Sequence, residues 1–328
     1  MKTARMYRLL ALVALLAGLW QSALGQSFPT KPIRVLTPFP PGGAVDVVAR
    51  TFSVVVGESI GQPILTENRP GGGTFVAMSA CAKAPPDGYT LCLTGADSLS
   101  FASYIFTKVP YDPEHDFVGI GRLLFTKGVI FASAQAPFNS FKEMIAYAKA
   151  NPGKVNFATW GAATIPHIHM EWFQRQLGTG FVQVPYKGGA PAVPAVLANE
   201  SQVSYFAIGQ MLPYFQSGKL KPLAVTAAKR SEALPAVPTL VEEGADSGLG
   251  SYMAVYAPAK TPMPVLERLN AEFNKAIGHP KVVEMMRQQH LDPAGDTVAD
   301  FNRFMKTDRE HAGQVFRALG LKPLDAPN

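Results

Sequence analysis

The sequence predicts an α/β protein made of two doubly wound lobes with a ligand cleft between them. Short apolar runs alternate with helical, apolar-periodic segments from about residue 33 to 101 and again from about 128 to 226. This alternation is typical of parallel strands joined by crossover helices. From about residue 250 one more strand precedes three amphipathic helices, which we expect to pack back on the first lobe.

The order of the elements follows from the apolar periodicity and from glycine and proline punctuation. We expect strands at residues 33–36, 63–66, 89–94, 128–133, 155–159, 181–184, 203–206, 221–226 and 252–257. We expect helices at 46–60, from the glycine-rich loop at 67–73 towards 83, and near 98. Further helices are expected at 140–150, 165–177, 190–198, from the strand at 203–206 up to 217, and at 262–277, 281–289 and 298–319. The stretch from 111 to 121 is interpreted as a connection.

The order of these elements along the chain predicts the domain organisation. We expect residues 26–127 together with 251–328 to form the first lobe and residues 128–250 to form the second. Residues 1–25 have the features of an export signal: Lys2, Arg5 and Arg8 precede an apolar run that is too short for a confident membrane span. Ala23-Leu24-Gly25 fits a small-x-small cleavage site, so we expect an exported protein that is cleaved near Gly25.

Charge and cysteine content indicate which kinds of binding site the chain is expected to have. The formal charge of +6 falls to +3 when the three basic residues of the signal are removed, and no Lys/Arg block remains. We therefore expect no nucleic-acid binding. Export permits a disulfide between Cys81 and Cys92, but the alternative of two buried, small apolar side chains stays open. A metal site is disfavoured because no histidine is close in sequence.

The stretch from Pro38 to Arg50 is the first candidate ligand site. Two prolines and two glycines form a turn between a strand and a helix, with Asp46 in the first turn of that helix. A helix N-terminus presents unpaired amides and partial positive charge, which favours an anion such as a carboxylate. The loop at 160–164, with Thr164 as N-cap, and the loop at 186–189 offer two further helix starts in the second lobe.

Together these stretches resemble the tripartite tricarboxylate transporter substrate-binding proteins, the Bug family of periplasmic receptors. The matching motifs include Lys31-Pro32-Ile33-Arg34, Pro41-Gly42-Gly43-Ala44-x-Asp46, Glu67-Asn68-Arg69-Pro70-Gly71, Pro86-Asp87-Gly88-Tyr89, Tyr111-Asp112-Pro113, Val184-Pro185-Tyr186-Lys187-Gly188 and Leu234-Pro235-x-Val237-Pro238-Thr239. They occur in order over nearly the whole mature chain. Each motif alone is weak, but the ordered set is specific.

The resemblance implies a periplasmic, monomeric solute-binding protein that is not an enzyme and needs no cofactor or metal. It implies a periplasmic binding protein-like arrangement of two lobes joined by crossing segments, like a Venus flytrap. It also implies a carboxylate ligand held between the lobes and delivered to the membrane permease subunits of a tripartite tricarboxylate-type transporter. The family's ligand loops map onto Phe39 to Asp46 and onto Gly161 to His167. The expected ligand-binding residues are Phe39, Gly42, Gly43, Ala44, Val45, Asp46, Phe75, Ser98, Gly161, Ala163, Thr164, His167, Tyr186 and Lys187.

Some positions depart from the family pattern. Val45 stands where a threonine is common, and Phe75 stands in a stretch that usually carries glycine and asparagine. Phe75 either lines the cleft or fills the core beneath its helix. If it lines the cleft, an aromatic dicarboxylate such as terephthalate is favoured over a small aliphatic diacid.

The rival interpretation is an exported hydrolase that acts on a small ester. Gly57-Glu58-Ser59-Ile60-Gly61 matches the pattern G-x-S-x-G, but a nucleophile elbow requires strand, turn and then helix. Ser59 is expected near the end of a helix, so this pattern gives little support to an enzyme. His167 and His169 are two residues apart on a helix and point to different sides, which disfavours a shared metal site.

Overall fold

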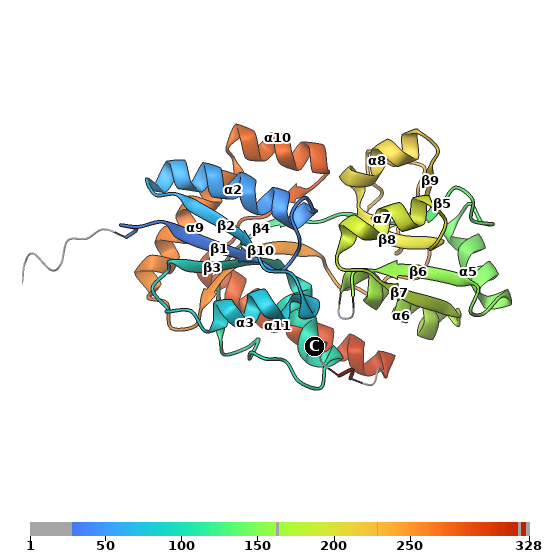
Figure 1. Ribbon diagram of the computed structural model, residues 1–328, viewed down its shortest axis with the longest axis horizontal. Helices are drawn as coiled ribbons and strands as arrows, with labels where there is room; N and C mark the ends of the chain where they lie inside the picture. The colour runs from blue at the N-terminus through green and yellow to red at the C-terminus, as the bar shows by residue number, and fades with distance from the viewer. Residues whose placement is uncertain (1–27, 162–163, 228, 321–322, 326–328) are drawn as a thin grey trace, which may run out of the picture.

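Two sheets, each covered by helices on both faces, form two lobes that lie side by side (Figure 1). The computed structural model describes residues 28–161, 164–227, 229–320 and 323–325. The predicted export signal and its cleavage site lie outside these residues. The six-stranded sheet has the order β11-β4-β10-β3-β1-β2, and the five-stranded sheet has the order β7-β6-β8-β5-β9. The predicted class of two doubly wound α/β lobes is confirmed.

The first lobe combines the start and the end of the chain. Its strands are β1 (Ile33–Thr37), β2 (Ile64–Asn68), β3 (Thr90–Gly95), β4 (Phe117–Phe125), β10 (Tyr252–Pro258) and β11 (Asp292–Pro293). The strands β1, β2 and β3 are parallel, as the alternating pattern predicts. β10 enters antiparallel between β3 and β4, so the chain returns to the first lobe as expected.

Helices cover both faces of this sheet because successive side chains of each strand point to opposite sides. They are α2 (Ala44–Ile60), α3 (Phe75–Ala82), α4 (Ala102–Ile105), α9 (Met263–Ile277), α10 (Pro280–Gln289) and α11 (Val298–Leu319), with short helical segments η2 (Gly72–Thr74) and η3 (Asp97–Phe101). Ile33 and Val35 of β1 pack in one core with α2, α9 and α10. Leu36 faces the other core, with α3 and α11.

The strand β4 corrects the expected connection at 111–121, because residues 117–121 belong to a central strand. Two glycines made this stretch look like a loop. A Cβ atom at Gly119 would lie 2.5 Å from the Phe301 ring, and one at Gly121 would lie 3.0 Å from Asn270 Nδ2. The glycines are therefore required by the close approach of α11 and α9 to the strand, not by a turn.

The second lobe is formed by a continuous part of the chain. Its strands are β5 (Gly128–Ser133), β6 (Val155–Thr159), β7 (Phe181–Pro185), β8 (Val203–Ala207) and β9 (Leu220–Val225). Its helices are α5 (Phe141–Ala150), α6 (Ile165–Leu177), α7 (Gly189–Leu197) and α8 (Ile208–Gln216). The helices α7 and α8 share a core with Val129 and Phe131, whereas Ile130 and Phe157 face the α5 and α6 side.

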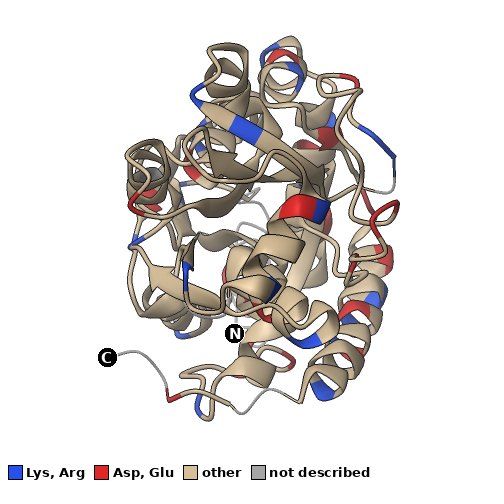
Figure 2. Ribbon diagram, turned by 90° about the vertical axis from the view of Figure 1, so that its right-hand side faces the viewer, with Lys and Arg blue, Asp and Glu red and all other residues tan. Residues whose placement is uncertain are grey.

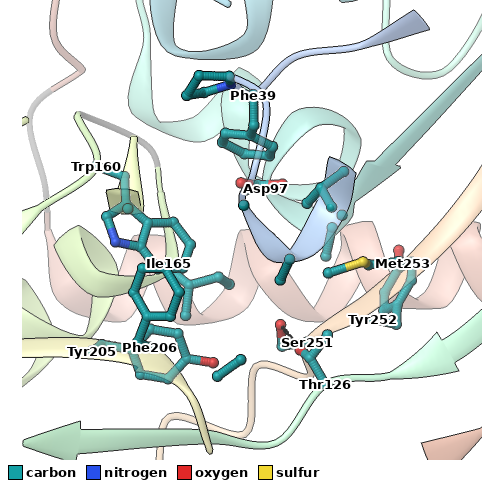
Figure 3. Close-up of a pocket in the computed structure, with 18 residues that line it drawn as sticks. Phe39, Asp97, Thr126, Trp160, Ile165, Tyr205, Phe206, Ser251, Tyr252 and Met253 are labelled. Carbon is teal, nitrogen blue, oxygen red and sulfur yellow. Dashed lines mark hydrogen bonds between the residues drawn. The ribbon is translucent and has the colours of Figure 1, made fainter. Parts of the chain in front are cut away.

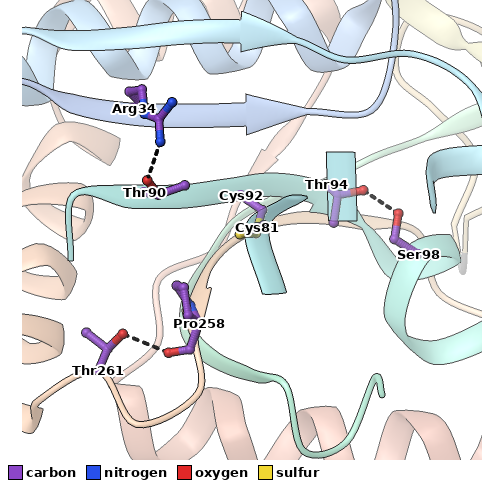
Figure 4. Close-up of a disulfide and its surroundings, with 8 residues drawn as sticks. All are labelled: Arg34, Cys81, Thr90, Cys92, Thr94, Ser98, Pro258 and Thr261. Atoms are coloured by element: carbon purple, nitrogen blue, oxygen red, sulfur yellow. Dashed lines mark hydrogen bonds between the residues drawn. A yellow bond between two sulfur atoms is a disulfide. The ribbon is translucent and has the colours of Figure 1, made fainter. Parts of the chain in front are cut away.

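A disulfide joins Cys81, in the last turn of α3, to Cys92 on β3 (Figure 4). The two Cα atoms are 6.1 Å apart, and both side chains are fully buried in the core. Of the alternatives left open by the sequence, the structure thus contains the bridge. It fixes α3 against the sheet that carries the cavity residues described below.

The chain passes between the sheets after β4 and again before β10. At this crossing the Thr126 N–H donates to the Ser251 carbonyl at 2.9 Å, and the two side-chain hydroxyls are hydrogen-bonded. The predicted domain boundaries at 127/128 and 250/251 stay a prediction, although the change of sheet occurs beside them. Basic and acidic residues are interspersed along the helices in the view of Figure 2. Within the described ranges no helix is long and apolar enough to cross a membrane.

The lobes touch where α8 meets the end of α10. Gly209 in α8 lies so close to α10 that a Cβ atom there would be 2.5 Å from Gln289 Cα. On the loop side, a Cβ atom at Gly188 would be 3.1 Å from Pro40 Cδ of the first lobe. Small residues therefore allow the two lobes to approach each other.

We predict that Gly209→Leu favours a more open arrangement of the lobes. Overlap with backbone atoms costs about 1–3 kcal/mol, and here that cost exists only while the lobes touch. An effect of about 1.4 kcal/mol would change the ratio of closed to open molecules about tenfold. Small-angle X-ray scattering of the protein without ligand should give a larger radius of gyration than wild type.

The matched control is Gly278→Leu at the exposed end of α9. The nearest atom to a Cβ there is the Lys275 carbonyl oxygen at 3.9 Å, so this variant should keep the wild-type radius. Equal radii for both variants and wild type would show that the α8–α10 contact does not limit opening.

Candidate functional site

A cavity lies between the two lobes, at the carboxyl ends of several strands (Figure 3). It encloses about 780 Å³ free of protein atoms, part of which is open to solvent. Ligand sites of α/β sheets occur at this edge, and small-molecule sites are common between domains. The lining residues are Phe39, Pro40, Gly43, Ala44, Val45, Gly95, Ala96, Asp97, Thr126, Trp160, Ile165, Gly189, Tyr205, Phe206, Ala207, Ser251, Tyr252 and Met253.

The first-lobe wall includes the N-terminus of α2. Its first backbone hydrogen bond joins the Val47 N–H to the Gly43 carbonyl at 3.0 Å. The amides of Gly43, Ala44 and Val45 precede that bond, and helix geometry leaves such groups without intrahelical acceptors. All three residues line the cavity. This wall therefore offers hydrogen-bond donors and the positive end of a 17-residue helix dipole.

Asp46 supports this wall from outside the cavity. It is 4% exposed, and its carboxylate accepts hydrogen bonds from the Gly42 amide at 3.0 Å, Arg50 Nε at 2.9 Å and Asn68 Nδ2 at 2.8 Å. Burial raises the pKa of Asp46, but these hydrogen bonds outweigh that effect and lower the pKa below its ordinary value. Asp46 stays ionised and holds the loop turn at Gly42, where φ is +87°. Neither Asp46 nor Gly42 lines the cavity.

The second-lobe wall is aromatic and contains two more helix starts. Trp160, after β6, packs against Phe206 with ring centroids 5.1 Å apart and reaches Phe39 across the cleft at 6.5 Å. Ile165 and Gly189, the first residues of α6 and α7, also line the cavity. A side chain at Gly189 would overlap the Phe206 ring, so glycine is required there. The cavity thus lies among the N-termini of three helices.

The structure places only some of the predicted residues on the cavity. Phe39, Gly43, Ala44 and Val45 line it. Ser98 is fully buried beside it, with its hydroxyl hydrogen-bonded to that of Thr94 at 2.6 Å. Ala163 lies outside the described residues, so its predicted contact is not tested.

Phe75 does not line the cavity but belongs to the core. It is 5% exposed and packs edge-on against Phe106 and Tyr111, with ring centroids 4.8 Å and 5.9 Å away. Of the two alternatives left by the sequence, core packing is the one observed. The aromatic surface expected from Phe75 comes instead from Phe39 and the second lobe.

The second-lobe residues that were expected at the ligand lie around the wall rather than on it. Thr164 donates its hydroxyl to the Gly161 carbonyl at 2.8 Å, which shapes the start of α6. His167 is 5% exposed, and burial lowers its pKa to about 4. Tyr186 packs on the core of α7 and α8, and Lys187 is exposed. None of the four is among the lining residues.

Sequence reasoning missed Asp97, Tyr205, Phe206 and the crossing residue Ser251. A usable signal existed, because Asp97 follows β3 and Tyr205 and Phe206 end β8. Residues at the carboxyl ends of strands are the ones expected at a ligand in this class of fold. Applied to every strand, this rule would have selected Asp97, Tyr205 and Phe206, but not Ser251, which precedes β10.

Among the described lining residues, Asp97 is the one acidic side chain, and none is basic. It is 6% exposed, and its Oδ1 accepts the Ser98 N–H at 3.1 Å. In the described part of the chain no Lys, Arg or His forms an ion pair with it. Burial raises its pKa to about 6, because a desolvated carboxylate without a cation favours its neutral form.

The remaining chemical candidates do not assemble into a reactive site. Ser59 lies in the last turn of α2 and donates to Glu272 at 2.6 Å, so it does not occupy a strand–turn–helix elbow. His169 is buried between Phe173 and Tyr205. No group of three metal-ligating side chains occurs among the residues that the structure describes.

We predict that Asp97→Asn stabilises the protein near neutral pH. Because the folded pKa is about 6 and the ordinary value is 3.8, the folded state carries an unfavourable charge above pH 6. The variant should raise the free energy of unfolding by about 3 kcal/mol at pH 7.5, and by only about 1 kcal/mol at pH 4.5, where folded Asp97 is protonated. Urea unfolding at both pH values measures this difference.

The control is the exposed Asp246, whose charge is solvated in both states. Asp246→Asn should give the same stability as wild type at both pH values. A destabilised Asp97→Asn at pH 7.5 would contradict the description of Asp97 as a buried carboxylate without a cationic partner.

Comparisons with known proteins agree with this architecture. The family described as "Tripartite tricarboxylate transporter family receptor" matches residues 48–321. A UPF0065 protein of Bordetella pertussis is 32% identical over 98% of this chain and 100% of its own length. Protein BugT of the same organism is 32% identical over 97% of this chain and 99% of its own length.

Solved structures show the same fold. The periplasmic binding protein BugD is 28% identical, covers 90% of this chain and 100% of its own, and superposes with a TM-score of 0.84. The R. palustris protein Rpa4515 with adipate is 27% identical over 91% of this chain and 100% of its own, with a TM-score of 0.85. MatC from Rhodopseudomonas palustris with bound malate is 26% identical over 88% of this chain and 100% of its own, with a TM-score of 0.82.

The family match spans most of the chain, and the relatives match it over nearly their full lengths. The chain therefore belongs to the tripartite tricarboxylate transporter receptor family, the Bug/TctC group of periplasmic solute-binding proteins, and is a receptor rather than an enzyme.

Proposed function

We propose that this receptor captures a small carboxylate between its lobes and delivers it to the permease subunits of a tripartite tricarboxylate-type transporter. The observation that carries the proposal is the N-terminus of α2, whose residues Gly43, Ala44 and Val45 line the cavity before the first helical hydrogen bond. Free amides at a helix start bind anions without a positively charged side chain. The starts of α6 and α7 add two further sites of this kind on the opposite lobe.

Two structural relatives support a carboxylate as the ligand class, because one contains adipate and the other malate. The cavity of this chain adds an apolar, aromatic wall formed by Phe39, Trp160 and Phe206. Such a wall favours a ligand with an apolar body, aliphatic or aromatic, beside its carboxylate. Terephthalate, the aromatic dicarboxylate expected from the sequence, is therefore kept as a test ligand, although Phe75 does not line the cavity.

Ligand capture would favour closure of the lobes. A molecule that touches both the α2 start and the aromatic wall gains contacts only when the lobes are together, so binding shifts the population towards the closed form. We propose that this form is the one recognised by the permease. We also propose that the protein acts as a monomer in the periplasm after cleavage of the export signal near Gly25.

A screen by thermal unfolding tests this function. The panel contains adipate, malate, benzoate, terephthalate and ε-aminocaproate, with glucose as a neutral control. A carboxylate at a hundred times its Kd should add about 2.7 kcal/mol to the free energy of unfolding, which raises Tm by several degrees. Turnover of a small ester, with no shift from any carboxylate, would contradict the proposal and favour the hydrolase.

We predict that Gly43→Asp blocks carboxylate docking. The site tolerates a side chain, because Gly43 has φ −79° and the nearest atom to a Cβ would be the Pro40 carbonyl oxygen at 3.8 Å. A negative charge at the helix start should repel the ligand carboxylate and weaken binding at least about tenfold. Isothermal titration with a binding carboxylate from the panel measures the effect.

The matched control is Gly43→Asn, which has the same shape without the charge. It should lose much less affinity than the aspartate variant, and both should keep the wild-type Tm without ligand. Equal affinities for the two variants would mean that no ligand carboxylate lies at the start of α2.

A further inference from the structure

We propose that the ligand carries a cationic nitrogen that pairs with Asp97, in addition to the carboxylate at the helix start, so that the receptor selects a zwitterion over a dicarboxylate. The inference rests on the proposed function and deepens it, because it names a second recognition element in the same cavity. Its basis is the position of Asp97 in the cavity wall, where none of the described lining residues is Lys, Arg or His.

The charge balance of the cavity is the first argument. Among the lining residues that the structure describes, Asp97 is the one carboxylate, and none is Lys, Arg or His. The polar remainder consists of hydroxyl groups and the Trp160 indole. The Tyr252 hydroxyl is already engaged, because it donates to Asp308 Oδ2 at 3.0 Å. A second ligand carboxylate in this space would meet Asp97 without a cation to offset the repulsion.

The surroundings of Asp97 are the second argument. Asp97 is one of the residues that line the space between the lobes (Figure 3). The titratable groups that act on it from neighbouring elements are Tyr111, Tyr205 and Tyr256, and burial raises the pKa of each hydroxyl, so none carries a charge near neutral pH. A buried carboxylate is costly unless it is paired. A cationic ligand group would supply the partner that the described lining residues do not.

The aromatic wall suits the same ligand. The rings of Phe39 and Trp160 lie edge to face across the cleft at 82° and enclose the space beside Asp97. Aromatic faces attract ammonium groups and also pack against an apolar body. A molecule with a carboxylate at one end, an apolar middle and an amine at the other end would satisfy all three parts of the cavity.

Two matched ligand series test the inference by isothermal titration of the mature protein near pH 7.5. The aromatic series is para-(aminomethyl)benzoate, para-ethylbenzoate and terephthalate, and the aliphatic series is ε-aminocaproate, heptanoate and adipate. Within a series the far end changes from ammonium to methyl to carboxylate at similar length. The ammonium compound should bind at least about tenfold more tightly than its neutral analogue, as expected for a charge-assisted hydrogen bond.

The variant Asp97→Asn should abolish this preference, so that the affinity ratio of the ammonium compound to its neutral analogue falls to about one. The control is Asp246→Asn, which removes an equal charge at an exposed position outside the cavity and should leave the ratio as in wild type. Because the ratio compares two ligands on one protein, a general change in stability or closure cancels.

The pH dependence separates the inference from its alternative, in which a protonated Asp97 donates to a second ligand carboxylate. With a folded pKa of about 6, Asp97 becomes ionised between about pH 5 and 7.5. Over this range binding of the ammonium compounds should strengthen in wild type but not in Asp97→Asn. Tighter binding of terephthalate or adipate than of the ammonium compounds, strengthened as the pH falls, would overturn the inference and leave carboxylate capture intact. Failure of all six compounds to bind would count against both.

Discussion

The buried carboxylate of Asp46 is the contact on which the site depends. It joins the Gly42 amide in the opening loop to Arg50, one turn further along α2, and to Asn68 at the end of β2. Hydrogen bonds to a charged group contribute about 1.5–3 kcal/mol each, although half-exposed Arg50 contributes less because water screens it. These bonds fix the direction in which α2 begins. The residues that follow Gly42, which carry the amides of the helix start, therefore line the cavity.

The same constraint explains why the cavity needs few polar side chains. Once the starts of α2, α6 and α7 are held around one space, the backbone supplies the donors. Side chains are then free to form an apolar wall, and glycines stand where a larger residue would fill the space or separate the lobes. Gly189 against Phe206 and Gly188 against Pro40 are such positions. Asp97 differs from the other lining residues because its side chain brings a charge into the cavity. This charge is the basis of the inference about the ligand.

Much of the fold could be predicted because its periodicity is strong. The helices at 165–177 and 298–319 begin and end where the apolar pattern places them. β4 could not be predicted in the same way, since Gly119 and Gly121 are selected by the helices packed on them and resemble loop residues in sequence. β11, with two residues, carries no pattern of its own.

The candidate site was predictable only where backbone geometry defines it. The opening loop was found from its glycines and its helix, and five of its residues line the cavity, four of which had been predicted. The orientation of a single side chain depends on contacts far away in sequence. Phe75 packs against Phe106 and Tyr111, which no local pattern reveals, and Tyr205 reaches the cavity only because the second lobe faces the first.

A crystal structure of the protein with its tightest-binding carboxylate would show whether the start of α2 holds the ligand. A carboxylate oxygen should lie within about 3 Å of a backbone nitrogen at Gly43, Ala44 or Val45, with the rest of the ligand between Phe39 and Trp160. A carboxylate bound elsewhere, for example at exposed Lys187 with only water at the start of α2, would contradict this placement.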